Sequence, residues 1–301
     1  MSHAIHHSSC SLLLALLGIF TCAASAQTYH YAAINVPGAQ STTANGINNS
    51  NVVVGSYLDK KNHNHGFLFK AGTYVHINVP NATDTSANGI NDNGDIVGTY
   101  SLPGSSTNPA NSHGFMLHNG IFKTIDCPNS QFNGANGINK FGTIVGQCET
   151  TNGTEGFIYK NGTFKFVNAP TVGNNDTQLN GISNLGEIAG QVFSGDDFRG
   201  FFFVGSDFDF LEAFQSLDNR AEGVNGHGDV VGCFNGSLAF LAFNPESGET
   251  EGATEKFPVL HTLSPFGSGN SCAMSINYAR AIVGWYLDSS FKQHGFLGVP
   301  Q

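Results

Sequence analysis

The sequence predicts an all-β fold, namely a six-bladed β-propeller built from four-stranded antiparallel blades. Three observations predict it: a composition unsuited to long helices, one block of sequence that recurs six times, and array ends that complement each other. The chain has 301 residues, of which 38 are Gly and only 11% are charged, whereas long helices are rich in Glu, Lys and Leu. A hydrophobic content of 40%, with 25 Phe, is enough for a buried core.

The repeated block is fourteen residues long and reads ANGINNSNVVVGSY in its first copy. A tripeptide such as His65-Gly66-Phe67 follows it, and then an aromatic and β-branched segment that ends near Pro, such as YVHINVP from Tyr74. The six copies of the block begin at Ala44, Ala87, Ala135, Leu179, Ala221 and Ala273.

Each unit therefore holds four short segments of β-branched and aromatic residues, separated by Gly, Asn or Pro. In the first unit we expect strands around residues 44–47, 53–57, 66–68 and 74–80. The first two are joined by a tight turn in which Gly or Asn supplies the positive φ of a hairpin. The units start 42 to 52 residues apart, which matches a propeller blade of about 40 to 50 residues and is too long for one coil of a parallel β-helix.

The ends of the array favour a closed ring over an open row. A lone fourth strand is expected at residues 31–37, and the sixth unit ends with its third strand shortly after Phe296. If the first strand pairs with the last, six complete blades result and no sheet edge is left exposed. We therefore expect one domain over residues 27–301, closed by pairing of the N-terminal strand with the C-terminal blade.

The N-terminus has the pattern of a signal peptide. An apolar run over residues 12–24 is followed by Ala24-Ser25-Ala26, which predicts a signal peptide over residues 1–26 and cleavage before Gln27. The preceding polar stretch has no Lys or Arg, which departs from the usual pattern. The run is shorter than the roughly 20 residues that a membrane helix needs. We expect a secreted protein, extracellular or periplasmic, with no membrane span and a monomeric state.

Charge and motifs exclude several function classes. A net charge of −10 argues against nucleic acid as a partner. The sequence contains no GxSxG, HExxH, phosphate-loop, CxxC or sialidase signature, so no catalytic residue is assigned and no cofactor or metal is expected.

Four cysteines follow the expected cleavage site, and four cysteines permit three connectivities. Sequence spacing does not choose among them. The order of strands in antiparallel blades brings the end of a fourth strand, the end of a second strand and the start of a first strand to one face. On that basis we predict the disulfides Cys127–Cys148 and Cys233–Cys272.

The recurring Gly-Ile-Asn, Ile-Val-Gly-x-Tyr and His-Gly-Phe segments resemble the bacterial extracellular HAF-type repeat, with Gly in place of the family's Ala. The resemblance covers residues 31–298. It implies secretion and a β-repeat fold, and it brings no established activity. In the third, fourth and fifth units the His position is occupied by Glu155, Arg199 and Leu238.

Loop lengths indicate where a ligand would bind. The connections between the second and third strands, and between units, vary most and open on one face, where binding residues concentrate on rigid scaffolds. On that face, three residues before each expected inner strand, three of six units have an acid: Asp84, Asp176 and Asp218. These carboxylates can bind sugar hydroxyls or a cation near the axis; alternatively, each caps its own turn.

Aromatic residues end several of the second strands. Stacking on sugar rings or packing between blades would explain them. We take Tyr57, Tyr100, Trp285 and Tyr286 as candidate ligand-binding residues. The repeated His65, His113 and His294 are read as hydrogen-bonding groups within blades, with metal binding as the alternative.

Three functions remain. The first is a secreted binding module that recognises an extracellular glycan or protein through the variable loops. The second is a carbohydrate-active hydrolase or lyase that uses carboxylates at the axial mouth. The third is a structural or adhesion scaffold.

Overall fold

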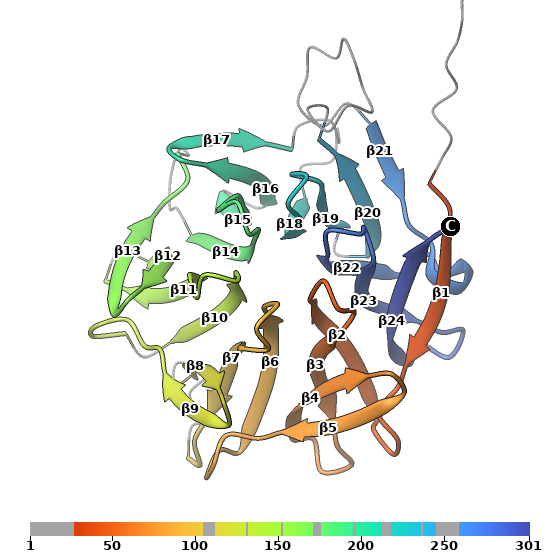
Figure 1. Cartoon of the computed structure of the whole chain (residues 1–301), viewed down its shortest axis with the longest axis horizontal. Coiled ribbons are helices and arrows are strands. Elements are labelled where there is room, and N and C mark those ends of the chain that lie inside the picture. Colours follow the sequence, from red (N-terminus) through yellow and green to blue (C-terminus); the bar gives the residue numbers. More distant parts are fainter. Residues whose placement is uncertain are drawn as a thin grey trace, which may run out of the picture.

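A computed structural model describes residues 27–104, 112–130, 132–151, 153–170, 176–194, 197–211, 218–235, 237–244 and 259–301. The described residues form six four-stranded antiparallel sheets, arranged as blades around a central axis (Figure 1). The predicted six-bladed propeller is thereby confirmed. The predicted signal peptide lies outside the described residues.

The strands follow one another outward from the axis within each of the first five blades. The first blade contains β2 (Ser41–Ile47), β3 (Val53–Leu58), β4 (Asn64–Lys70) and β5 (Thr73–Ile77). The second contains β6 (Asp84–Ile90), β7 (Ile96–Ser101), β8 (Ser112–His118) and β9 (Ile121–Thr124). The third contains β10 (Asn133–Ile138), β11 (Ile144–Thr150), β12 (Gly153–Lys160) and β13 (Thr163–Val167).

The remaining blades repeat this order. The fourth contains β14 (Asp176–Ile182), β15 (Ile188–Ser194), β16 (Asp197–Val204) and β17 (Asp207–Phe210). The fifth contains β18 (Asn219–Val224), β19 (Val230–Phe234), β20 (Leu238–Phe243) and β21 (Val259–Thr262). A short 3-10 helix (Pro265–Gly267) precedes the sixth, which contains β22 (Ser271–Ile276), β23 (Ile282–Leu287), β24 (Gln293–Pro300) and β1 (Tyr29–Ile34).

The ring closes as predicted, because β1 pairs antiparallel with β24 (Figure 1). The register runs from Tyr29 opposite Pro300 to Ile34 opposite Gly295. One further main-chain bond, from the N–H of Gln301 to the oxygen of Thr28 (2.9 Å), extends the pairing to the C-terminus. Both edges of the array are therefore hydrogen-bonded.

Blade packing explains the Gly-Phe part of the repeat. The third strand of every blade places one fully buried ring in the core: Phe67, Phe115, Phe157, Phe201, Phe240 and Phe296. The glycine of the second strand lies against that ring, since a Cβ on Gly55 would lie 2.8 Å from the ring of Phe67. The repeat thus keeps Gly where the Phe ring needs the space.

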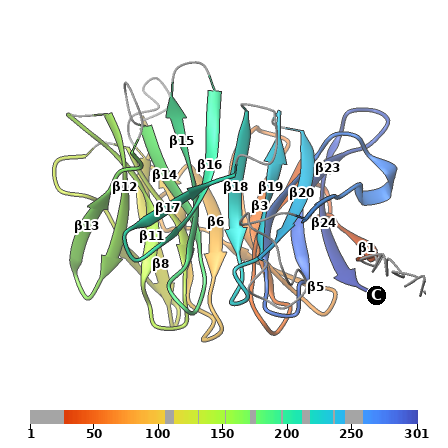
Figure 2. The same cartoon turned by 90° about the horizontal axis from the view of Figure 1, so that it is seen from above.

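The two ends of the propeller differ. We call the end with the tight turns, such as residues 48–52, the turn face, and the opposite end, with the connections to the third strand and between blades, the variable face (Figure 2). Residues 246–255, between β20 and β21, lie outside the described residues, as does most of the connection 101–112 between β7 and β8.

Two disulfides are present, and they are the two pairs predicted from strand order. Cys127 joins Cys148 with a Cα–Cα distance of 6.3 Å, and Cys233 joins Cys272 at 5.0 Å. The second bridge links β19 of the fifth blade to β22 of the sixth. Disulfides are typical of exported proteins. Among the described residues, no helix is long and apolar enough to cross a membrane.

Candidate functional site

Asparagines of the inner strands link neighbouring blades around the axis. The side-chain amide of Asn45 donates to the main-chain oxygen of Ala87 in the next blade (3.0 Å). The same bond recurs at Asn88, Asn136 and Asn180, with distances of 3.0 to 3.1 Å. We call these four residues the inner amide ladder. The fifth and sixth blades depart from it, with Glu222 and Met274 at the equivalent positions.

A second set of asparagines, at the tight turns, forms what we call the turn amide ladder. Its members are Asn48, Asn91, Asn139, Asn225 and Asn277. The Oδ1 of Asn48 accepts the N–H groups of Ser50 and Val52, and its Nδ2 donates to the oxygen of Asn91 (3.1 Å). The Asn of the Gly-Ile-Asn motif therefore shapes its own turn and binds the next blade.

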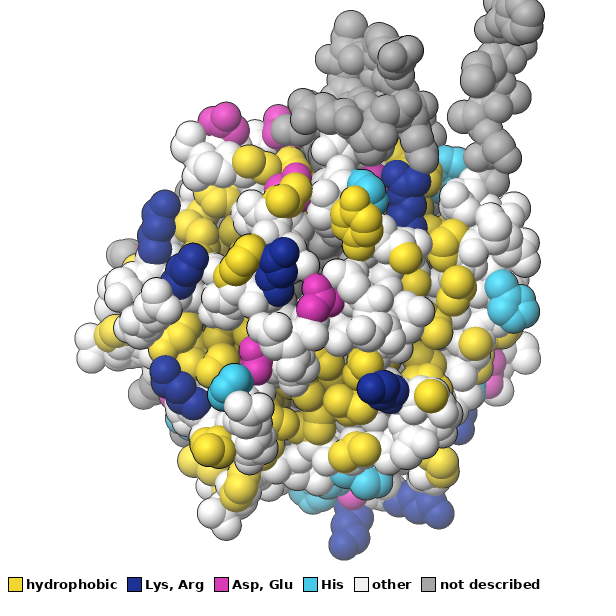
Figure 3. All heavy atoms as spheres, in the orientation of Figure 1, with side chains coloured by type: hydrophobic (Ala, Val, Ile, Leu, Met, Phe, Trp, Pro, Cys, Tyr) yellow, Lys and Arg dark blue, Asp and Glu magenta, His cyan; other side chains and the backbone are white. Residues whose placement is uncertain are grey.

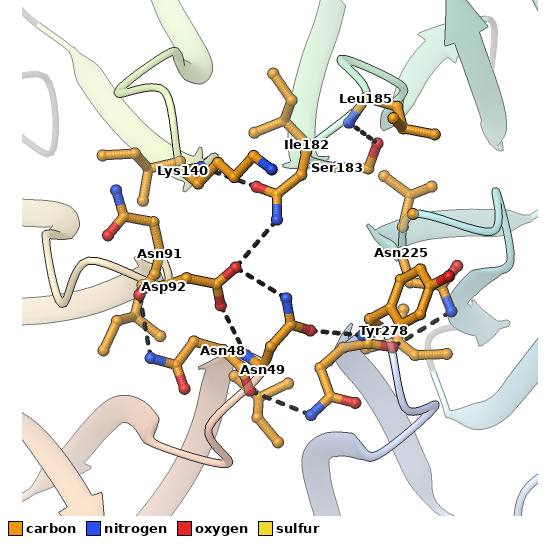
Figure 4. A pocket seen from close by; sticks show the side chains of 18 residues that line it. Asn48, Asn49, Asn91, Asp92, Lys140, Ile182, Ser183, Leu185, Asn225 and Tyr278 are labelled. Atoms are coloured by element: carbon orange, nitrogen blue, oxygen red, sulfur yellow. Dashed lines mark hydrogen bonds between the residues drawn. The ribbon is translucent and has the colours of Figure 1, made fainter.

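The turn-face end of the axis is a pocket of about 450 Å³ (Figure 4). Asp92 points into it and accepts hydrogen bonds from the main-chain N–H (2.9 Å) and side-chain amide (2.8 Å) of Asn49. The amide of Asn184, from the fourth blade, also reaches Asp92 of the second blade (3.1 Å). This bond joins two blades that are not neighbours in the ring.

The rim of the turn-face pocket mixes charge and exposed apolar surface. Leu185 and Tyr278, which line the pocket, are 74% and 57% exposed, and Phe141, next to the lining residue Lys140, is 62% exposed. The ammonium group of Lys140 lies 4.9 Å from the centre of the Phe141 ring. The space-filling view shows hydrophobic, basic and acidic side chains around the centre of this face (Figure 3). The carboxylate of this pocket is already hydrogen-bonded within the protein.

The other end of the axis, toward the variable face, opens into a cavity of about 340 Å³, which we call the axial cup. Its walls come from the first and second strands of the blades, and seven of its eleven lining residues have amide side chains. They are Asn45, Ser56, Ser86, Asn88, Asn136, Gln147, Gln178, Asn180, Gln191, Glu222 and Met274.

Several groups of the axial cup are held in place by neighbouring residues. The amide of Gln191 donates to the Oε1 of Gln178 (2.8 Å), and Ser86 donates to the Oδ1 of Asn88 (2.8 Å). Asn136 donates to Gln147. Gln191 is 6% exposed, and its own Oε1 has no hydrogen-bond partner. A preorganised polar wall of this kind matches a ligand rich in hydroxyl groups.

Glu222 is the one carboxylate that lines the axial cup. Burial raises the pKa of Glu222 to about 7, while the positive charge of Arg220, two residues earlier on β18, acts in the opposite direction. A carboxyl oxygen of Glu222 and the sulfurs of Cys233 and Cys272 lie within 4.8 Å of one another. Among the described residues, this is the one cluster of three side chains of the types that can bind a metal ion. Because those sulfurs form a disulfide, they do not provide thiolate ligands for a metal.

Of the three predicted aspartates, Asp84 and Asp176 begin the inner strands β6 and β14 and Asp218 immediately precedes β18; none of them lines the axial cup. The Oδ1 of Asp84 accepts the N–H of Asn64 in the preceding blade (2.8 Å), and the Oδ1 of Asp176 accepts the N–H of Thr154 (2.9 Å). Asp218 has a buried Oδ1 without a partner. Their role in ligand binding stays a prediction.

The predicted tyrosines stack on the repeated histidines near the variable face. The ring centres of Tyr57, Tyr100 and Tyr286 lie 5.0 to 5.3 Å from those of His65, His113 and His294. Trp285 lies half-buried in β23. Ligand binding by these four aromatic residues is likewise still a prediction.

The histidines bind within their own blades. Both ring nitrogens of His294 are hydrogen-bonded, Nδ1 to Asn35 (2.7 Å) and Nε2 to Asp288 (2.9 Å). The bond from His294 is the main reason why the pKa of Asp288 lies well below its usual range. These contacts fit the reading of His as a hydrogen-bonding group of the blade.

Sequence reasoning missed the axial cup. Its signal was present in the second position of the repeated block, where four units have Asn and the fifth has Glu222. This position lies in the expected first strand of each unit, and the alternation of side chains along a strand does not by itself show which of its two faces is turned to the axis.

The fold and the polar axial cup define a six-bladed β-propeller with a central cavity. No protein-family model matches the sequence, and no curated protein matches it significantly. Among solved structures, virginiamycin B lyase from Staphylococcus aureus is similar, with 14% identity, a TM-score of 0.50, and coverage of 90% of this chain and all of that one.

Two further structures show the same kind of similarity. A putative gluconolactonase has 10% identity and a TM-score of 0.51, with coverage of 91% of this chain and 92% of that one. The Aleuria aurantia lectin, in a structure with Fucα1-6GlcNAc, has 11% identity and a TM-score of 0.41, with coverage of 90% of this chain and 79% of that one. At such identities the similarity concerns the fold alone.

Proposed function

We propose that this chain is an exported binding protein whose axial cup recognises a neutral, hydroxyl-rich ligand, namely a glycan. The observation that supports this most is the composition of the cup, with seven amide side chains and two hydroxyl side chains. Amides present a donor and an acceptor together, as sugar hydroxyls do, so each can bind a hydroxyl without a change of protonation.

Charge supports a neutral ligand. The chain has a net charge of −10, and Glu222 is the ionisable group that lines the cup. Acidic sugars would be repelled by both. Export is supported by the two disulfides and by the predicted signal peptide, and membership of the HAF-type repeat group is part of the same proposal.

The test is a glycan array probed with residues 27–301 and two variants. The first variant, Ser56→Trp, places a large side chain at the cup wall. The sixth blade already has a Trp, Trp285, at the equivalent position. Filling the cup should weaken binding by about tenfold or more, since hydroxyl contacts are then blocked. Lys140→Gln, on the turn face, is the matched control and should bind like wild type.

A hydrolase or lyase needs an acid and base pair. A time course of the array-positive oligosaccharide, followed by mass spectrometry, separates binding from turnover. We expect intact oligosaccharide. New reducing ends or unsaturated products would replace the binding proposal by the catalytic one.

A further inference from the structure

We propose that the glycan site extends from the axial cup into the seam between the second and third blades, so that the protein binds a neutral oligosaccharide rather than a single sugar. This inference rests on the proposed function. The seam contains a second cavity of about 320 Å³, which we call the side groove. Its wall includes Asn64, Asp84, Thr99, Tyr100, Ser101 and Ser112.

The two cavities adjoin each other. Ser86, Asn88, Asn136 and Gln147 line both the axial cup and the side groove. Each cavity alone lies at the lower end of the range of about 300 to 1,000 Å³ typical of ligand sites. Together they form one elongated polar site that runs from the axis outward, which suits a chain of sugars.

The seam is open because its facing side chains are small. The disulfide between Cys233 and Cys272 shows which two positions face each other across a seam between blades. One lies on the second strand of a blade and the other on the inner strand of the next blade. Between the second and third blades the equivalent positions are Thr99 and Gly134. Between the fourth and fifth blades they are Gln191 and Arg220, which occupy far more volume.

The side groove has the chemistry to recognise hydroxyl groups. Its wall contains hydroxyl side chains at Thr99, Ser101 and Ser112 and one carboxylate, that of Asp84. The Oδ1 of Asp84 accepts the N–H of Asn64, so the carboxylate is held in position. No Lys or Arg is among the described groove residues, which disfavours acidic sugars.

Tyr100 supplies an apolar ring at the groove. Stacking on His113 (5.0 Å between ring centres) and a hydrogen bond between its hydroxyl and Thr124 (3.0 Å) fix its orientation. A fixed aromatic ring beside hydroxyl groups can contact the C–H face of a sugar while the polar groups bind its rim. The predicted residues Asp84 and Tyr100 thus gain a common role.

Gly134→Gln tests this directly, because Gln is the residue of the fourth blade at the same position, Gln178. The backbone tolerates it, since Gly134 is absent from the residues with positive φ. A Cβ there would meet the side-chain ends of Gln147 (3.0 Å) and Asn136 (3.4 Å). Thr99→Gln fills the groove from the other wall and guards against a folding defect in the first variant.

The measurement is the dissociation constant for array-positive neutral saccharides of increasing length, from monosaccharide to tetrasaccharide. Wild type should gain about tenfold or more in affinity with length. Both Gln variants should lose that gain. Thr99→Gln, at a position that does not line the cup, should keep wild-type affinity for the monosaccharide, whereas Lys140→Gln should match wild type throughout. If wild-type affinity does not depend on saccharide length, or if both Gln variants keep the wild-type gain with length, the proposed side-groove site is wrong. The proposal that the axial cup binds a glycan would still stand. Absence of binding to every saccharide would overturn both.

Discussion

The side-chain amide of Asn277, in the last blade, donates to the main-chain oxygen of Asn48, in the first blade (3.1 Å). The two residues are 229 positions apart in sequence, and their bond extends the turn amide ladder across the junction between the last blade and the first. The same Asn277 accepts the N–H of Ala281 through its Oδ1 (2.9 Å). One side chain therefore shapes a turn and joins the ends of the propeller.

The ladder predicts opposite effects at two equivalent positions. Asn277→Ser keeps an oxygen for the turn, as Ser183 does in the fourth blade, but loses the amide that reaches Asn48. The free energy of unfolding should fall by about 1 to 2 kcal/mol. Ser183→Asn supplies the amide that the fourth blade lacks, and this change should raise the free energy of unfolding by about 1 kcal/mol. Urea unfolding measures both; equal midpoints for all three proteins would show that the ladder does not contribute.

Ring closure predicts that β1 stabilises the whole domain. Removal of residues 27–37 exposes the edge of β24, which then loses its main-chain hydrogen bonds. The melting temperature should fall and the protein should tend to associate through the free edge. Calorimetry and light scattering check this, with the full mature chain as control. A monomer with an unaltered melting temperature would contradict the closed ring.

Glu222 predicts a pH dependence of stability. In the folded protein its pKa is about 7, whereas in the unfolded chain a Glu has a pKa of about 4.3. The folded state thus binds more protons between these values, so the free energy of unfolding falls as pH rises from about 4 to about 7 and then levels off.

Glu222→Gln should remove this dependence. Wild type and variant should be equally stable near pH 4, and the variant should be more stable at pH 8 by up to roughly 3 kcal/mol. Denaturant titrations at a series of pH values measure the difference. Parallel pH profiles for the two proteins would mean that Glu222 ionises normally.

The two disulfides predict graded losses of stability. The bridge Cys233–Cys272 spans 39 residues and Cys127–Cys148 spans 21, and a longer closed loop restricts the unfolded chain more. Replacing both cysteines of a pair by Ser should lower the free energy of unfolding by about 2 to 4 kcal/mol, slightly more for Cys233–Cys272. Mass mapping of unreduced peptides verifies the pairs first; mixed connectivities would contradict the strand order.

Strand and turn signals are local, which is why the sequence is sufficient to predict six blades. Their closure, which joins the two ends of the chain, could be predicted because the ends of the array complement each other. The boundaries were less accurate. The first inner strand begins at Ser41 rather than near residue 44, because Ser41 and Thr42 pair with Leu58 and Tyr57. The strand β6 likewise includes Asp84, so that this aspartate lies in the sheet rather than before it.

The site was harder to predict because it depends on contacts between blades. A β-bulge between Ala44 and Gly46 shifts the register of the inner strand, and the close approach of neighbouring strands requires Gly46, whose Cβ would lie 2.9 Å from the oxygen of Asn88. Neither feature can be read from spacing alone. Which asparagines face the axis followed only from the assembled ring.

The position of a bound oligosaccharide tests the central claim most directly. Crystals of residues 27–301 grown with an array-positive neutral tetrasaccharide should show one sugar in the axial cup against Gln178 and Glu222, with the chain continuing along Tyr100 and Asp84. Density in the turn-face pocket around Asp92, or a saccharide on the outer surface of the blades with the cup holding water alone, would contradict the account.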